Sequence, residues 1–182
     1  MNIKQRHLKY LCMFVLGFCI AFITLPVNGQ DNRTFHGHLI ELGPMEEETI
    51  CLAKNIYFEA GNQPVAGKIA VAQVVQNRVD NPHYPETICD VVYQAQWREN
   101  WKGNMIPVRH MCQFSWFCDG KSDIPVDSAT WMFSVLTAES VLRGDFGDIT
   151  EGATHYHADS VHPYWADSLN ETVIINNHIF YK

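Results

Sequence analysis

Three stretches of the chain repeat apolar residues every three or four positions, which places them on one face of an α-helix. The first covers residues 45–60 and opens on acidic residues, which the positive end of a helix dipole favours. The second covers residues 64–78 and is apolar nearly all round, which predicts a central, buried helix. The third covers about residues 126–142, with Asp127 or Ser128 as its cap.

The remaining segments predict shorter elements. Residues 87–96 are expected to form a short helix, and residues 97–110, rich in Trp, Asn, Gly and Pro, a loop. Near the carboxyl end the pattern changes to that of strands, expected at residues 153–158, 172–175 and 178–181. Asn176-Asn177 supplies a two-residue turn between the last two strands. Together these elements predict an α+β fold, mainly helical, with a small antiparallel sheet near the C-terminus.

The amino-terminal segment has the pattern of an export signal. Three basic residues precede an uncharged run at residues 10–25, and Pro26 ends that run. We expect residues 1–29 to be a cleaved signal peptide; the alternative is a membrane anchor formed by residues 10–25. In both cases the protein is exported and works in the periplasm or cell wall. Residues 30–45 read as a linker, and residues 46–182 as the folded domain.

The charge of the chain excludes one class of partner. The chain has 13 basic and 20 acidic residues, a net charge of −7. Three of the basic residues precede residue 30 and all the acidic ones follow it, so the remainder is more acidic still. Such a body is unsuited to binding nucleic acid, which requires cationic contacts to phosphate. Contact with a membrane is expected only through the amino-terminal segment if that segment is not cleaved, and the domain is expected to be a monomer.

Four cysteines follow the export segment, at positions 51, 89, 112 and 118. An even number in an exported domain suggests two disulfides, for which three pairings are possible. Cys112 and Cys118 are close enough in sequence to close a small loop, and Cys51 would then join Cys89. Four free thiols are the alternative. Zinc ligation by all four is disfavoured because no Cys-x2-Cys pair is present.

Glu59 is the leading candidate for chemistry. It lies at the end of the first predicted helix, next to Tyr57 and Phe58 and just before Gly61. Apolar rings disfavour the charged form of a carboxyl group, so a glutamate among them keeps its proton near neutral pH and can act as a general acid. From the pattern alone, an ordinary solvated glutamate is the commoner outcome.

A series of motifs around Glu59 follows the order of a known family. The motifs cover about residues 48–182 and lie at residues 51–60, 67–79, 84–92, 112–120 and 152–157, the last accompanied by Pro163-x-Trp165-Ala166 and residues 178–181. The series resembles the SleB/CwlJ family of cell-wall hydrolases. The resemblance implies a lysozyme-like catalytic domain over residues 46–182, cleavage of peptidoglycan glycan strands, and Glu59 as the catalytic residue.

One stretch departs from the family pattern. Where the family usually continues Glu-Ala-Arg-Gly-Glu, this chain has Glu59-Ala60-Gly61-Asn62-Gln63. Gln63 therefore replaces the second glutamate of the family. An amide can still hydrogen-bond a sugar, but a role that needs a carboxylate at this position is in doubt.

The resemblance also implies a mechanism that works with one carboxylate. Hydrolysing glycosidases usually need two. In a lytic transglycosylase, the C6 hydroxyl of the muramyl (MurNAc) sugar attacks its own anomeric carbon and releases the following GlcNAc. Glu59 would act first as acid and then as base, leave a 1,6-anhydro end, and need no cofactor. Proximity within one sugar ring replaces much of what a second carboxylate supplies. Ordinary hydrolysis of the same bond, as by a muramidase, is the alternative.

Further residues of these motifs are expected to bind the glycan strand. Amide and hydroxyl groups can bind the N-acetyl and hydroxyl groups of the sugars, and aromatic rings can stack on sugar faces. For a tryptophan, packing in the core is the commoner alternative. The candidate substrate-binding residues are Tyr57, Gln63, Gln113, Ser115, Trp116, His155, Tyr156 and Trp165.

Two other functions remain open at this point. His155 and His157 share one face of a predicted strand, as zinc ligands of a peptidoglycan amidase or peptidase would, with His162 and His178 nearby. A His-Glu-x-x-His signature is absent, so we expect no metal. The replacement at Gln63 also allows a non-catalytic wall-binding module, although the retained Glu59 argues against it.

Overall fold

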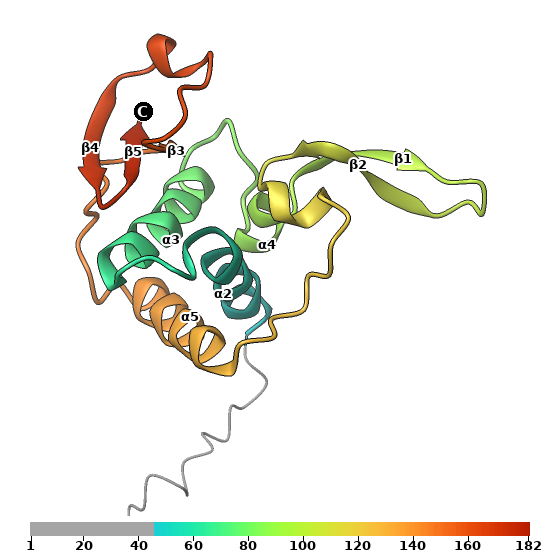
Figure 1. Ribbon diagram of the computed structural model, residues 1–182, viewed down its shortest axis with the longest axis horizontal. Coiled ribbons are helices and arrows are strands. Elements are labelled where there is room, and N and C mark those ends of the chain that lie inside the picture. Colours follow the sequence, from blue (N-terminus) through green and yellow to red (C-terminus); the bar gives the residue numbers. More distant parts are fainter. Residues whose placement is uncertain (1–45) are drawn as a thin grey trace, which may run out of the picture. The chain divides into compact units, whose positions relative to one another are not determined.

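The computed structural model describes residues 46–182 (Figure 1). Helices and antiparallel strands both occur in this part of the chain, which confirms the α+β class. In chain order the elements are α2 (Glu47–Ala60), α3 (Val65–Val79), α4 (Ile88–Val92), β1 (Ala95–Glu99), β2 (Met105–Cys112), α5 (Ser128–Leu142), β3 (His155–Ala158), β4 (Glu171–Ile175) and β5 (His178–Tyr181), with short 3-10 helices at Ser115–Cys118 and Ala166–Ser168.

The three long predicted helices are present and pack side by side (Figure 1). Helix α2 contacts α3, α4 and α5, and it carries the fully buried Leu52 and Ile56. Asp127 caps α5, because its side chain accepts a hydrogen bond from the backbone N–H of Thr130 at 2.6 Å. Helix α3 is buried along most of its length, as its lack of a polar face predicts. Its central position makes it the support for both the helices and the sheet.

The carboxyl-terminal sheet has the strand order β3-β5-β4, and both pairings are antiparallel. Ile175 and His178 lie directly opposite each other, so Asn176 and Asn177 form the two-residue turn that the sequence predicts. Asn176 has a φ of 54°, a left-handed conformation that asparagine tolerates. Phe180 of β5 is fully buried, and it packs with residues of α3. The sheet is thereby fixed to the central helix.

The structure corrects the predicted short helix at residues 87–96 and the predicted loop at residues 97–110. Helix α4 ends at Val92, and β1 and β2 then form an antiparallel hairpin that projects from the helical body (Figure 1). Most side chains of this hairpin are exposed, so it lacks the clear alternation of buried and exposed positions by which a strand is recognised. Its turn is closed by Asn100, whose Oδ1 accepts hydrogen bonds from two backbone N–H groups.

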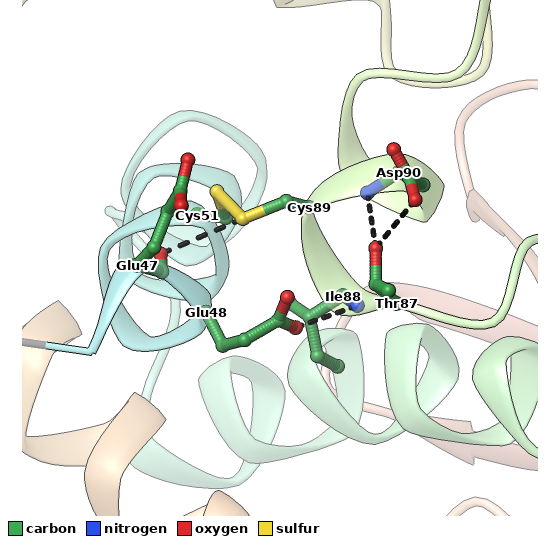
Figure 2. Close-up of a disulfide and its surroundings, with 7 residues drawn as sticks. All are labelled: Glu47, Glu48, Cys51, Thr87, Ile88, Cys89 and Asp90. Carbon is green, nitrogen blue, oxygen red and sulfur yellow. Dashed lines mark hydrogen bonds between the residues drawn. A yellow bond between two sulfur atoms is a disulfide. The ribbon is translucent and has the colours of Figure 1, made fainter.

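Both disulfides expected from the cysteine spacing are present. Cys51–Cys89 joins α2 to α4, with the Cα atoms 5.2 Å apart (Figure 2). Beside it, Oε2 of Glu48 accepts a hydrogen bond from the first backbone N–H of α4, that of Ile88, at 2.7 Å. The second disulfide, Cys112–Cys118, joins the end of β2 to the 3-10 helix that follows.

The predicted export signal at residues 1–29 and the linker at residues 30–45 lie outside the described residues. Within residues 46–182, no helix combines the length and the apolar character needed to cross a membrane.

Candidate active site

Glu59 lies half-buried in the last turn of α2. Its Oε2 accepts a hydrogen bond of 3.0 Å from the hydroxyl of Tyr156, which β3 brings from the far end of the chain. Burial raises the pKa of Glu59 above its ordinary value, while the Tyr156 hydrogen bond and the charge of Arg78 oppose the rise. The net pKa is raised, so Glu59 keeps its proton to a higher pH than an ordinary glutamate. A general acid requires this property.

Arg78, near the end of α3, is the cation of this site, and the sequence analysis assigned it no role. It is only 3% exposed. Its guanidinium carbon lies 5.4 Å from the ring centre of Tyr84 and 5.1 Å from that of Phe114, and its Nε donates a 2.7 Å hydrogen bond to the carbonyl of Thr154. A buried guanidinium is costly unless it is paired. Ring faces and a carbonyl oxygen supply much of that pairing here.

Gln113 completes the environment of Arg78. With its amide oxygen turned toward the guanidinium, Gln113 accepts hydrogen bonds from both Nη atoms, at 3.1 and 3.2 Å. The exposed Ser115 follows at the start of the 3-10 helix, between the two cysteines of the second disulfide. Arg78 therefore connects three parts of the site: the Gln113 segment, the start of β3, and the vicinity of Glu59.

The segment that begins with β3 contributes further residues to the site. Nε2 of His155 lies 3.4 Å from the hydroxyl of Tyr84, and the ring centres of His155 and Trp165 are 5.3 Å apart. Burial and the charge of Arg78 lower the pKa of His155, which favours the neutral imidazole. The structure thus brings together Glu59, Tyr156, Gln113 and His155 around Arg78.

Two of the predicted substrate-binding residues, Trp116 and Tyr57, make contacts that stabilise the fold. Trp116 is 7% exposed; its indole N–H donates to Oδ1 of Asn55 at 3.0 Å, and its ring is stacked on Phe58 at 4.8 Å. This placement agrees with the core-packing alternative for Trp116 rather than with a sugar-stacking surface. The hydroxyl of Tyr57 accepts hydrogen bonds from the backbone N–H groups of Val126 and Asp127, and so ties α2 to the segment before α5.

Gln63 lies in the turn between α2 and α3. The ammonium group of Lys68 donates hydrogen bonds to the backbone carbonyls of Gly61 and Gln63, which fixes the turn. A side chain at Gly67 would lie 2.9 Å from Cβ of Gln63, so the chain needs glycine at position 67 for this close approach. Gln63, which stands where the family has a glutamate, therefore lies in a closely packed turn.

The histidines proposed as zinc ligands have other partners. Nε2 of His157 lies 2.9 Å from the hydroxyl of Tyr181, and its Nδ1 lies 2.9 Å from the carbonyl of Ala158. His162 faces Asp167 at 3.0 Å. In the part of the chain that the structure describes, no group of three or more His, Cys, Asp or Glu side chains is placed to hold a metal ion. The geometry thus lends no support to the zinc alternative.

Sequence reasoning missed Arg78 and Tyr84 as members of the site, although both lie in the quoted motifs. A signal for Arg78 is present in the sequence: it is a cation at the end of a helix that is apolar nearly all round. Since such a helix is buried, its arginine must find partners in the interior. Tyr84 carries no comparable signal, because its role depends on the path of the chain after α3.

Comparison with known proteins gives consistent matches. A family model described as Cell Wall Hydrolase matches residues 62–181. The matched range begins just after Glu59, so the case for Glu59 rests on the geometry above. A curated relative, the spore cortex-lytic enzyme of Halalkalibacterium halodurans, is 27% identical over 142 residues, which are 78% of this chain and 36% of the relative. The chain thus spans about a third of the length of that relative.

Two solved structures have a similar fold. The catalytic domain of SleB from Bacillus cereus is 23% identical, with a TM-score of 0.54, and the match covers 74% of this chain and 90% of that one. The catalytic domain of the germination-specific lytic transglycosylase SleB from Bacillus anthracis is 22% identical, with a TM-score of 0.58, and the match covers 77% of this chain and 98% of that one.

Proposed function

Since the chain belongs to the Cell Wall Hydrolase family, we propose that it cleaves the glycan strands of peptidoglycan, with Glu59 as general acid and base. The observation that carries the proposal is the half-buried Glu59, whose pKa is raised, whose carboxyl group accepts a hydrogen bond from the Tyr156 phenol, and which feels the charge of the Arg78 guanidinium. The names of the relatives support the same substrate: one is a spore cortex-lytic enzyme and another a lytic transglycosylase.

The proposed reaction is an intramolecular transfer between MurNAc and GlcNAc. Protonated Glu59 donates its proton to the glycosidic oxygen, and the bond between that oxygen and the anomeric carbon of MurNAc breaks. The C6 hydroxyl of the same MurNAc then attacks the anomeric carbon and gives its proton to the Glu59 carboxylate. The products are a 1,6-anhydro-MurNAc end and a free GlcNAc 4-hydroxyl, so no water is consumed and Glu59 is again protonated.

The neighbours of Glu59 suit this use of a single carboxylate. After the first proton transfer Glu59 is an anion, which the Tyr156 hydroxyl stabilises by its hydrogen bond and Arg78 by its charge. This stabilisation supports a mechanism in which one carboxyl group acts first as acid and then as base.

We assign substrate binding to residues of two segments. Gln113 and Ser115 supply exposed polar groups in one, and His155 and Trp165 supply an imidazole and a ring in the other. Gln63 is proposed to hydrogen-bond a sugar at the position where the family has a glutamate. Tyr57 and Trp116 contribute by holding α2 and the 3-10 helix in place.

The proposed place of action is outside the cytoplasm, in the periplasm or cell wall. Two disulfides in a small domain are typical of an oxidising compartment. The export pattern of residues 1–29 supports the same location. We propose that the working form is a monomer.

Glu59→Gln tests the role of the carboxyl group. The amide keeps the shape of the side chain but cannot donate an acidic proton, so the release of fragments from insoluble peptidoglycan should fall by about 10²-fold or more. Folding and cosedimentation with the wall should be unchanged. Glu47→Gln is the matched control, because it makes the same change at an exposed position of the same helix.

Mass spectrometry of the released fragments tests the reaction type. Transfer to the C6 hydroxyl yields muramyl ends one water lighter than the reducing ends that hydrolysis yields. Reducing ends would replace the transglycosylase assignment by a muramidase, while Glu59 kept its role as acid. Normal fragment release by a folded Glu59→Gln protein would contradict the assignment of Glu59 itself.

A further inference from the structure

The β1–β2 hairpin carries exposed groups that the chemistry at Glu59 does not use. Trp101 at its tip is 89% exposed, and the ammonium of Lys102 lies 4.8 Å from the centre of the Trp101 ring. Arg98 and Arg109 are exposed on the two strands, and Met105 is 59% exposed. An exposed combination of rings and cations on a projecting element is typical of a binding surface.

The charge of the hairpin is opposite to that of the rest of the domain. Residues 95–112 contain three basic residues and one acidic residue, whereas the other described residues contain six basic and 17 acidic ones. None of the three hairpin cations forms an ion pair with a carboxylate anywhere in residues 46–182, while the exposed Lys121 and Arg143 both do. The hairpin thus offers positive charge to a ligand that carries carboxylates or other anions.

The base of the hairpin is firmly joined to the candidate active site. The backbone N–H of Gln113 donates a 2.8 Å hydrogen bond to the carbonyl of Gln94, and the disulfide Cys112–Cys118 follows directly. Trp97 of β1 lies 5.9 Å from the ring centre of Phe117, in the same 3-10 helix as Trp116. A ligand on the hairpin is therefore held at a defined place relative to Glu59.

The hairpin is long enough to place its tip well away from the negative charges of the rest of the domain. Strand β2 runs from Met105 to Cys112, which at about 3.3 Å per residue is about 23 Å. Charges in water are screened over about 8 Å at physiological salt. An anionic ligand at the tip is therefore largely screened from the negative charge of the rest of the domain.

We propose that this hairpin binds the stem peptides of the same polymer that is cut at Glu59, so that the enzyme prefers glycan strands that carry peptides. The inference rests on the proposed function. Stem peptides are attached to MurNAc and bear free carboxylates, which Arg98, Lys102 and Arg109 bind. The Trp101 ring covers the apolar part of the peptide.

The connection between the base of the hairpin and the candidate active site favours the stem peptide as the ligand. A glycan strand that contacts both Gln113 and Glu59 lies beside the base of the hairpin, where β2 ends at Cys112, and its stem peptides can extend from there along the hairpin toward the tip. An anionic lipid surface would meet the same cations, but it has no such connection to the bound glycan.

The test compares two soluble substrates, glycan strands with their stem peptides and the same strands stripped of them by an amidase. The hairpin variant is Arg98→Gln/Lys102→Gln/Arg109→Gln in the full chain. We expect its KM for peptide-bearing strands to rise roughly tenfold with little change in kcat, since the loss of each exposed ion pair weakens binding about twofold. Its KM for stripped strands should equal that of the wild type. Lys121→Gln/Arg143→Gln/Lys182→Gln removes the same charge elsewhere and should leave both KM values unchanged.

Equal KM values for the two substrates in the wild type, or an equal loss on both in the hairpin variant, would overturn the inference. So would binding to phosphatidylglycerol vesicles that the hairpin variant loses while it keeps the wild-type KM for peptide-bearing strands. If the wild type cleaved neither substrate, the proposed function would fail instead. Binding of the two kinds of strand to Glu59→Gln protein would then still test the hairpin, with tighter binding of peptide-bearing strands expected.

Discussion

At the residue scale, the protonation of Glu59 results from opposing effects. Burial at the end of α2 raises its pKa, and the Tyr156 hydroxyl and the Arg78 charge lower it. Both proton transfers of the proposed reaction, from Glu59 and back to it, need a pKa between these extremes. A carboxyl group that is too acidic would not protonate the leaving oxygen, and an anion without stabilisation would form too slowly.

Tyr156→Phe should shift the alkaline limb of the pH–rate profile to higher pH. The general acid must be protonated, so the rate falls as the pH rises through the pKa of Glu59. Without the hydroxyl the carboxylate loses a hydrogen bond that lowers its pKa, so the pKa of Glu59 rises further. The maximal rate should also fall, because the anion formed during the reaction is less stable.

Tyr84→Phe is the matched control for this prediction. It makes the same chemical change within the site, but the Tyr84 hydroxyl faces His155 and not Glu59. Its alkaline limb should stay at the wild-type pH. A shift in both variants, or in neither, would show that the Tyr156 hydrogen bond does not set the pKa of Glu59.

Residue-scale contacts are predictable from sequence only where neighbours in the chain make them. The apolar neighbours Tyr57 and Phe58 single out Glu59 without a structure. Its actual partner Tyr156 lies 97 positions away, and the contact exists only because β3 packs beside α3. For this reason the resemblance could name Tyr156 as a site residue, but no local pattern could pair it with Glu59.

At the element scale, each disulfide supports a different function of the fold. Cys51–Cys89 spans 38 positions and fastens α4 to α2 within the core. Cys112–Cys118 spans six positions and holds the segment with Gln113 and Ser115. The first should therefore matter more for stability, and the second more for the shape of the site.

Removal of the first disulfide should lower the stability more, and removal of the second should lower the activity more. In the loop-entropy model, Cys51→Ala/Cys89→Ala lowers the free energy of unfolding by about 4 kcal/mol and Cys112→Ala/Cys118→Ala by about 2 kcal/mol, because the larger loop restricts the unfolded chain more. At a temperature where both variants are folded, the second should lose more glycan-cleaving activity. Urea unfolding and fragment release measure the two effects; the same ranking in both would contradict this division.

Helices and strands that bury one face were predictable from the sequence, whereas the β1–β2 hairpin, which buries none, was missed. The long helices and the last two strands carry apolar residues that pack in the core, so their spacing reveals them. The hairpin is stabilised instead by its own ladder, the Asn100 turn and the disulfide at its base. None of these requires a buried face, and so residues 97–110 read as a loop.

At the scale of the whole molecule, α3 joins the two apolar clusters of the domain. Ile69, Ala72 and Val75 belong to the cluster formed with α2, α4 and α5. Ala70 and Val74 belong to the cluster formed with the sheet. Since α3 is surrounded on both sides, its sequence is apolar all round, and this pattern correctly predicts its central position.

This arrangement predicts which fragments of the chain can fold. Both clusters and both disulfides lie within residues 46–182. A fragment of residues 44–182 should therefore unfold at the same temperature as the full chain and cleave soluble glycan strands at the same rate. A fragment of residues 62–182 keeps the range that matches the family, but it lacks α2 with Leu52 and Ile56. Losing each such buried side chain costs about 2–5 kcal/mol, against a typical total stability of about 5–15 kcal/mol. The shorter fragment should accordingly show no cooperative thermal transition by circular dichroism. Cooperative unfolding of residues 62–182, or its absence in residues 44–182, would contradict the view that α2 and α3 form one core.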